Sequence, residues 1–243
     1  MRRQKVVPTQ LYKILRGEVL NLQASVKDGN ETIYLFWGDR AIGKTTSAKR
    51  VAEDLPGVWY VPLNPMNTKS ESSFVRALVE AMQKPTKWGA LANLKTLTEE
   101  TEPQIFLLDN GEELFNLKSR TPKTPPLLRM VKYLTEVGHG FAIISNEDIP
   151  PKIAVYREVW KRVRKVVKFE EIYPEDINHF AEAYSVKVSD PQKLFDIAKE
   201  LGLTAIDLSD IFRQAFFNML HELDAKTFKQ LAKSLFAQRL ATA

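Results

Sequence analysis

The fold of this chain is constrained most by an octapeptide, GDRAIGKT, at residues 38–45. It matches the pattern G-x-x-x-x-G-K-[ST], follows a short apolar segment at residues 33–37 and precedes a helical pattern that continues to about Asp54. Glycines let such a loop curl so that its backbone N–H groups point at phosphate oxygens, and the positive end of the following helix adds to that field. The octapeptide therefore predicts a strand, a phosphate-binding loop and a helix, in this order.

We expect this loop and the start of its helix to bind the phosphates of ATP. Lys44 is placed to bridge the β- and γ-phosphates, and the Thr45 hydroxyl is placed to ligate Mg²⁺. ATP and Mg²⁺ are therefore the predicted cofactors. The predicted nucleotide-binding residues of this segment are Gly38, Asp39, Arg40, Ala41, Ile42, Gly43, Lys44, Thr45 and Thr46.

Apolar segments alternate with helical patterns through the first two thirds of the chain. The predicted strands are 33–37, 58–63, 105–108, 141–145 and 166–169. The predicted helices are 8–27, 43–54, 70–83, 91–101, 126–137 and 153–164. Five strands separated by helices predict an α/β fold, in which a parallel five-stranded P-loop sheet carries helices on both faces.

Beyond Pro174 the sequence pattern is helical only, which predicts a small all-α lid at the C-terminal end. Its expected helices are 175–184, 191–201, 206–220 and 225–240. The expected domains are an N-terminal helical extension at 1–29, a nucleotide-binding α/β domain at 30–172 and the C-terminal helical lid at 173–243.

The apolar segment 105–108 ends in Asp109. Ligands bind at the carboxyl ends of parallel strands, so this carboxylate is expected to hold the Mg²⁺ shell; the alternative is that it only begins a turn. The next residue, Asn110, stands where enzymes of this layout normally carry a Glu that polarises the attacking water. An amide cannot act as a general base. Either hydrolysis is slow, or Glu112 acts in its place.

Four further residues are candidates for contacts with ATP. Asn146 follows the fourth predicted strand and is expected to orient water against the γ-phosphate, with a turn or helix cap as the alternative. Arg162 and Arg164 precede the fifth strand, and a guanidinium offered across a subunit contact would neutralise charge on a neighbour's γ-phosphate. The alternative for both is membership of a basic patch. Arg213 is a candidate for a phosphate contact within the chain.

The formal net charge of +5 is unevenly distributed over the 243 residues. Residues 1–116 hold 15 basic and 14 acidic side chains, residues 117–168 hold 12 and 4, and residues 169–243 hold 8 and 12. Clustered Lys and Arg can displace condensed counterions from a phosphate backbone, so the middle stretch, with a net charge of +8, indicates a polyanion site. A solvated helix face is the alternative.

Composition excludes several classes of protein. Hydrophobic residues are 44% of the chain and charged residues 27%, so it can bury a core rather than stay disordered. It has no Cys, which excludes a disulfide framework, a thiolate metal site and a Cys nucleophile. No segment approaches the roughly 18–20 continuous apolar residues of a membrane helix, and no apolar signal core follows the basic start. We expect a cytoplasmic protein with no membrane partner.

Four segments, in the order GDRAIGKT, LLDNGEEL, ISN and KRVRKVVKFEEIYPEDI, resemble the AAA+ ATPases over about residues 30–220. The VWYVPL segment and the loop after it are most similar to the Mu B and TnsC family of transposition proteins. This resemblance implies an ATPase that oligomerises on duplex DNA as an ATP-bridged filament, selects targets for DNA transposition and recombination, and activates a transposase. It also implies that Asn146 is the sensor and that Arg162 or Arg164 is the finger reaching the adjacent subunit.

The resemblance further implies two DNA-facing loops, at residues 64–70 and 117–126. The second loop carries three cations and no acid, which by itself suits phosphate contacts with weak sequence preference. The alternatives are a helicase loader of the same superfamily, a nucleotide switch that signals without touching DNA, and, less favoured, a small-molecule P-loop kinase. The DNA contacts expected from the two loops are Lys69, Lys118, Arg120 and Lys123.

Overall fold

The computed structural model describes residues 9–117 and 124–242, which form two compact units. The sheet unit consists of Leu15–Gly38 and Thr45–Phe169. The helical unit consists of the residues up to Ile14, the loop segment Asp39–Lys44 and the residues from Glu170 onward. Within the described ranges, no helix combines the length and the apolar character that crossing a membrane requires.

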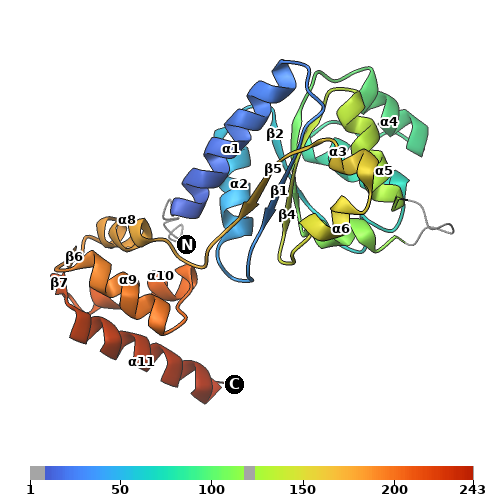
Figure 1. The fold of residues 1–243 in the computed structure, drawn as a ribbon. Coiled ribbons are helices and arrows are strands. Elements are labelled where there is room, and N and C mark those ends of the chain that lie inside the picture. The colour runs from blue at the N-terminus through green and yellow to red at the C-terminus, as the bar shows by residue number, and fades with distance from the viewer. Residues whose placement is uncertain (1–8, 118–123, 243) are drawn as a thin grey trace. The chain divides into compact units, whose positions relative to one another are not determined.

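A parallel five-stranded sheet with the order β2-β3-β4-β1-β5 forms the centre of the sheet unit (Figure 1). Its strands are β1 (Ile33–Trp37), β2 (Val58–Pro62), β3 (Ile105–Asp109), β4 (Gly140–Ser145) and β5 (Val163–Lys168). This confirms the predicted α/β fold. β4 lies between β1 and β3, with Ser145 paired to Trp37 and Ile144 paired to Asp109. The carboxyl ends of these three strands therefore meet at one end of the sheet, where ligands bind in such folds.

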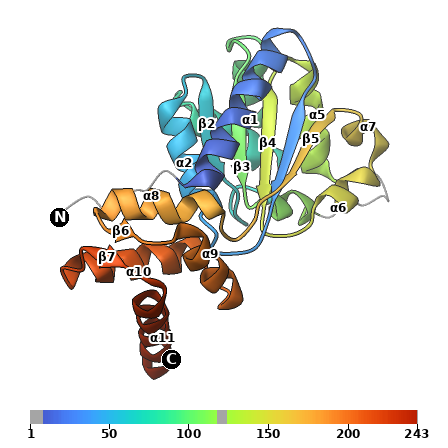
Figure 2. The same ribbon diagram turned by 60° about the vertical axis from the view of Figure 1, so that its left-hand side comes forward.

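Helices cover both faces of this sheet (Figure 2). Successive strand residues point to opposite faces. Leu35 of β1 joins the apolar core on one side, whereas Phe36 stacks on Phe169, with ring centroids 5.6 Å apart. The closeness of one helix layer explains Gly140, because a Cβ there would lie 2.7 Å from Val26 Cγ2. The two layers, labelled in Figure 1, are α1 (Gln10–Lys27) with α2 (Lys44–Asp54), and α3 (Glu71–Ala81) with α4 (Ala90–Thr98) and α5 (Pro126–Glu136).

The prediction of one helix over residues 153–164 is wrong. This part of the chain forms α6 (Pro150–Ala154), α7 (Arg157–Trp160) and the start of β5. β5 pairs with β1, and the Ile33 amide donates to the Arg162 carbonyl (N···O 2.8 Å). This pairing satisfies backbone groups of β1 that a helix through residue 164 would leave without partners. Arg164 therefore lies in a strand and not in a helix.

The helical unit has a core of its own. Its helices after Phe169 are α8 (Pro174–Tyr184), α9 (Pro191–Glu200), α10 (Ala205–Phe217) and α11 (Ala225–Thr242). The predicted C-terminal helices are therefore confirmed, but this part of the chain is not purely helical. Two short strands, β6 (Lys187–Val188) and β7 (Glu222–Leu223), pair in parallel. Strands of two residues are too short to leave a periodic pattern in the sequence.

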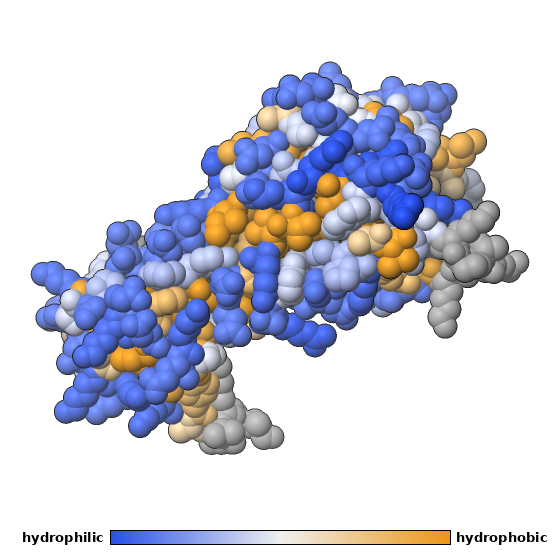
Figure 3. All heavy atoms as spheres, in the orientation of Figure 1, coloured by the Kyte–Doolittle hydropathy of each residue, from blue (hydrophilic) through white to orange (hydrophobic). Residues whose placement is uncertain are grey.

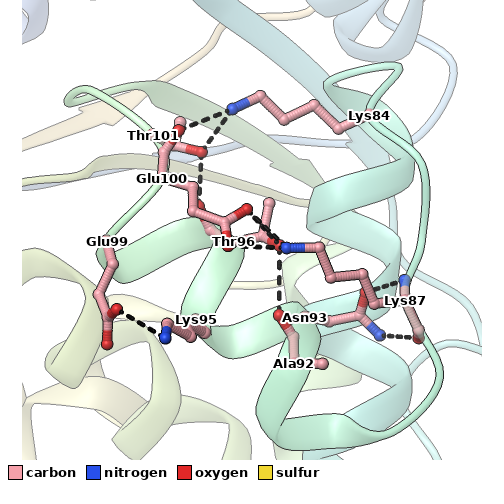
Figure 4. A network of polar contacts seen from close by, with 9 residues as sticks. All are labelled: Lys84, Lys87, Ala92, Asn93, Lys95, Thr96, Glu99, Glu100 and Thr101. Atoms are coloured by element: carbon pink, nitrogen blue, oxygen red, sulfur yellow. Dashed lines mark hydrogen bonds and ion pairs between the residues drawn. The ribbon is translucent and has the colours of Figure 1, made fainter.

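The connection between α3 and α4 is held by a network of polar contacts (Figure 4). The buried Asn93 side chain accepts a hydrogen bond from the Lys87 amide (2.8 Å) and donates to the carbonyls of Lys87 (2.9 Å) and Gly89 (3.2 Å). The Lys87 ammonium pairs with the Glu100 carboxylate (2.6 Å), and the Lys84 ammonium donates to the Glu100 carbonyl (3.1 Å). These two lysines therefore stabilise the connection, and their charges are engaged within the chain.

The buried His139 ring joins three elements of the sheet unit. Its Nδ1 accepts a hydrogen bond from the Gln104 amide (3.1 Å), and its Nε2 lies 2.9 Å from the Leu97 carbonyl, to which it can only donate. The neutral tautomer that carries its proton on Nε2 satisfies both contacts, whereas a proton on Nδ1 would face another donor. Burial lowers the pKa of His139 below its ordinary value of 6.5.

We expect this histidine to make folding stability depend on pH. The pKa of His139 is lower in the folded chain than in the unfolded chain, so below about pH 6.5 the unfolded chain binds more protons. Lowering the pH through this range therefore reduces the free energy of unfolding, by at most about 1.4 kcal/mol per pH unit. Urea denaturation between about pH 5 and 7.5 measures this. His139→Gln should flatten the dependence, and His221→Gln, at an exposed position, should not. Equal slopes in all three proteins would contradict the prediction.

Candidate nucleotide-binding site

The phosphate-loop segment Asp39–Lys44 curls around its own backbone. Gly43 has φ +95°, a conformation that favours glycine, and Ala41 has φ 64°, which is strained for a residue with a Cβ. Ile42 is buried and anchors the segment, and the ammonium of the buried Lys44 donates to the Asp39 carbonyl. The side chains of Asp39 and Arg40 are exposed. The turn expected from the two motif glycines is therefore present, with its lysine directed at the loop backbone.

In the sheet unit, the Asp109 carboxylate at the end of β3 is held by three donors. Its Oδ2 accepts from the Thr45 hydroxyl (2.7 Å) and from the Tyr60 hydroxyl (2.8 Å), and its Oδ1 accepts from the Asn110 amide (3.1 Å). The structure thus brings together Thr45 and Asp109, the two predicted Mg²⁺ ligands. A hydroxyl and a carboxylate are hard oxygen donors of the kind that Mg²⁺ prefers, so these residues fit the ion.

Tyr60 is a residue of this site that the sequence analysis missed. Burial, and then the neighbouring Asp109 carboxylate, raise the pKa of the Tyr60 hydroxyl far above its ordinary value, so it stays a donor. The Lys49 ammonium of α2 lies 5.4 Å from the centroid of its ring. An aromatic residue in an apolar strand normally signals a core position. Only the pairing of β2 with β3 brings this one to the Asp109 side chain.

A second polar cluster lies where β4 ends. The Glu112 carboxylate accepts from the Ser145 hydroxyl (2.8 Å), from the Asn146 side-chain amide (3.2 Å) and from the Asn146 backbone amide (3.4 Å). Glu112 belongs to the 3₁₀ turn η1 (Gly111–Phe115) that follows β3. The structure therefore brings together two residues, Glu112 and Asn146, that were predicted separately to act on the attacking water.

The neighbours of Glu112 explain how it reaches this position. Asn110 is left-handed (φ 60°, ψ 50°), and its side-chain amide donates to the Leu63 carbonyl (3.1 Å), so it fastens the end of β2. Gly111 lies directly against β4, since a Cβ there would come within 2.4 Å of Ile143 Cγ2. Only a glycine lets the turn pass this close to β4. The carboxylate three residues after Asp109 can therefore contact the end of β4.

The three candidate arginines have different surroundings. The Arg162 side chain is only 11% exposed, and its guanidinium pairs with Glu31 (2.7 Å) and Glu136 (2.5 Å) of its own chain. Arg164 is exposed on β5 and, among the residues that the structure describes, makes no ion pair. In the helical unit, Arg213 is 44% exposed and pairs with Asp210 (2.5 Å). Arg164 is thus the arginine most available to a neighbouring subunit.

Of the four predicted DNA contacts, only Lys69 lies within the described residues. It is exposed, and it follows a turn in which the Asn64 side chain accepts from the amides of Met66 (2.9 Å) and Asn67 (3.2 Å). Lys118, Arg120 and Lys123 lie outside the described residues. Hydrophilic residues cover most of the visible face of both units (Figure 3). Exposure alone therefore does not single out one DNA-binding surface.

The comparisons with known proteins show the fold. No family model matches the sequence, and no curated protein matches it either. The structure of the Aeropyrum pernix ORC2 protein as ADPNP–ADP complexes has a TM-score of 0.64 and 15% identity, over 96% of this chain and 68% of that one. The Aeropyrum pernix ORC1 protein in complex with DNA has a TM-score of 0.57 and 14% identity, over 92% and 65%.

A Walker-type ATPase of Pyrococcus abyssi is similar as well, with a TM-score of 0.59 and 14% identity, over 93% of this chain and 74% of that one. Identities of this size establish a common fold and nothing finer. The chain therefore shares the fold of these structures, with the parallel α/β sheet and the C-terminal helices that its sequence predicted. None of these three structures is named for transposition, so the likeness to Mu B and TnsC stays a prediction.

Proposed function

We propose that this protein binds and hydrolyses ATP with Mg²⁺. One observation carries the proposal: Glu112 and Asn146 are hydrogen-bonded at the end of β4, and the adjacent strand β3 ends in Asp109, which is bonded to Thr45. Phosphoryl transfer to water requires a carboxylate, an amide that orients the water and a metal site of hard oxygen ligands. Here these parts lie at the ends of adjacent strands. The complexes with ADPNP and ADP of the ORC2 protein, which has the same fold, support nucleotide binding.

Each residue has a defined part in this proposal. Thr45 and Asp109 hold Mg²⁺, which when bound neutralises phosphate charge, and Lys44 contacts the β- and γ-phosphates. Glu112 accepts a proton from water that Asn146 orients. Three hydrogen bonds already occupy the Glu112 carboxylate, two on Oε2 and one on Oε1, so one acceptor position on Oε1 is left for water. The amide at position 110 supports slow basal turnover that DNA or a partner accelerates.

We also propose that the protein assembles on duplex DNA as an ATP-bridged oligomer and acts as a transposition target selector and transposase activator. The net charge of +8 over residues 117–168 supports DNA binding, as does the DNA complex of the similarly folded ORC1 protein. ATP-gated assembly would multiply weak contacts through avidity. A helicase-loader role is the second candidate, since the fold likeness is to ORC proteins. A nucleotide switch that does not touch DNA is the third.

We expect ATP-dependent binding to duplex DNA to weaken as salt rises, but less than the charge count suggests. Of the nine cations between residues 117 and 168 that the structure describes, six are paired within the chain, which leaves them less available to phosphates. If the four predicted loop cations contact phosphates, a plot of log K against log[salt] should have a slope of roughly −4 per subunit. Eight contacts, the number that the net charge of +8 suggests, would give a slope of roughly −7. Anisotropy titrations of a labelled duplex at several salt concentrations measure this slope.

Variants make the DNA prediction specific. Lys69→Ala should reduce the magnitude of the slope by about one, because one phosphate contact is lost. Lys95→Ala is the matched control, because Lys95 is an exposed cation paired with Glu99 (3.3 Å), and it should leave the slope unchanged. Affinity that does not vary with salt would contradict DNA binding without affecting the ATPase proposal. Electron microscopy with ATP and long duplex DNA separates the candidates, since filaments favour the transposition role and isolated particles the loader.

A further inference from the structure

The hydrogen bonds of Asp109 leave one acceptor position open. A carboxylate has two oxygens with about four acceptor positions in all. Thr45 and Tyr60 take both positions on Oδ2, and the Asn110 amide takes one on Oδ1. Among the described residues, no further donor contacts this carboxylate. The fourth acceptor position, on Oδ1, is therefore left for the Mg²⁺ shell.

Without Tyr60 this arrangement would be held less firmly. Oδ2 would keep only the hydrogen bond from Thr45 and Oδ1 only that from the Asn110 amide, so the plane of the carboxylate could turn more freely about its Cβ–Cγ bond. The Tyr60 ring is itself held, because it lies on β2 within the sheet and the Lys49 ammonium lies over its face. A side chain fixed in this way can place its hydroxyl reproducibly.

We propose that Tyr60 is a positioning residue for Mg²⁺: its hydroxyl holds Asp109 Oδ2 beside Thr45, so that Oδ1 is the oxygen offered to the metal shell. This inference rests on the proposed nucleotide site. Tyr60 touches neither nucleotide nor metal in this role and acts through Asp109 alone. A purely structural role for the hydroxyl would alter the stability of the sheet and leave metal affinity unchanged, which makes the two roles separable.

The test uses Tyr60→Phe, which removes one oxygen and keeps the ring. The full chain is saturated with the non-hydrolysable analogue ADPNP and titrated with Mn²⁺, whose free ion gives an electron paramagnetic resonance signal. We expect Mn²⁺ affinity to fall by about 10-fold or more, as is usual when a partner of a metal ligand is removed. Affinity for a fluorescent ATP analogue in EDTA should be unchanged, because metal-free binding does not use Asp109.

Tyr34→Phe is the matched control, since Tyr34 is a buried tyrosine on β1, which β3 and β4 separate from β2, and it should leave Mn²⁺ affinity unaltered. Asp109→Asn should weaken Mn²⁺ binding, and Tyr60→Phe should add nothing in that background. Unchanged Mn²⁺ affinity in a folded Tyr60→Phe protein would overturn the inference. If that variant does not fold, Lys49→Met takes its place, because it removes the cation over the Tyr60 ring and keeps the hydroxyl. This variant must lower Mn²⁺ affinity, and an unchanged affinity would overturn the inference. Failure of the wild-type chain to bind ATP with Mg²⁺ present would count against the proposed function instead.

Discussion

Lys44→Ala is expected to abolish ATP binding at any practical concentration and, with it, ATP-dependent assembly on DNA. The Lys44 side chain is buried against the loop and donates to the Asp39 carbonyl, so its ammonium is held where the motif requires it. Each charge-assisted hydrogen bond contributes about 1.5–3 kcal/mol. Two such bonds to phosphate therefore correspond to an affinity loss of roughly 100-fold or more. Titration with a fluorescent ATP analogue measures this loss directly.

The matched control for Lys44 is Arg50→Ala. Arg50 lies on the same helix, α2, and is an exposed cation that pairs with Asp54 (3.1 Å). Its removal changes the net charge by the same amount, so ATP affinity and assembly should both persist. A Lys44→Ala protein that still coats long duplex DNA only when ATP is present would refute the idea that ATP gates assembly through this loop. Circular dichroism of both variants shows whether the fold is retained.

Glu112→Gln is expected to lower the rate of ATP hydrolysis by roughly 10²–10⁴-fold, which is the usual contribution of a general base. Glutamine keeps the size of the side chain, and its carbonyl can still accept from the Ser145 hydroxyl or the Asn146 amide, so the cluster at the end of β4 should remain folded. ATP affinity should not change, because Lys44 and the metal ligands are intact. Phosphate release under saturating ATP measures the rate.

Glu113→Gln is the control for the second prediction. The Glu113 carboxylate belongs to the same turn but accepts from the Thr68 hydroxyl (3.4 Å) and the Asn116 side chain (2.7 Å), not from the β4 cluster. Its variant should hydrolyse ATP at the wild-type rate. If Glu113→Gln is the slow variant and Glu112→Gln is not, the base is misassigned. Fast basal release by the wild-type chain would contradict the slow turnover expected from Asn110.

Much of the fold was predictable because its signals are local. Apolar runs such as 105–109 and the octapeptide at 38–45 give each strand and the loop after it a distinctive short pattern. The segment that ends in Arg164 was mispredicted because a charged edge strand and an exposed helix have similar compositions. Its conformation depends on pairing with β1, a partner about 130 residues earlier in the chain.

The sequence by itself determined the phosphate loop, the strand that ends in Asp109, the parallel α/β class and the helical C-terminal part, since each depends on neighbours in the chain. The tertiary structure decided which side chains meet. It paired Glu112 with Asn146, gave Asp109 a donor in Tyr60 and engaged Arg162 with two carboxylates. The physical reason is the sheet order. Strands distant in sequence become neighbours only when their backbone groups pair, and no local pattern encodes which strand lies beside which.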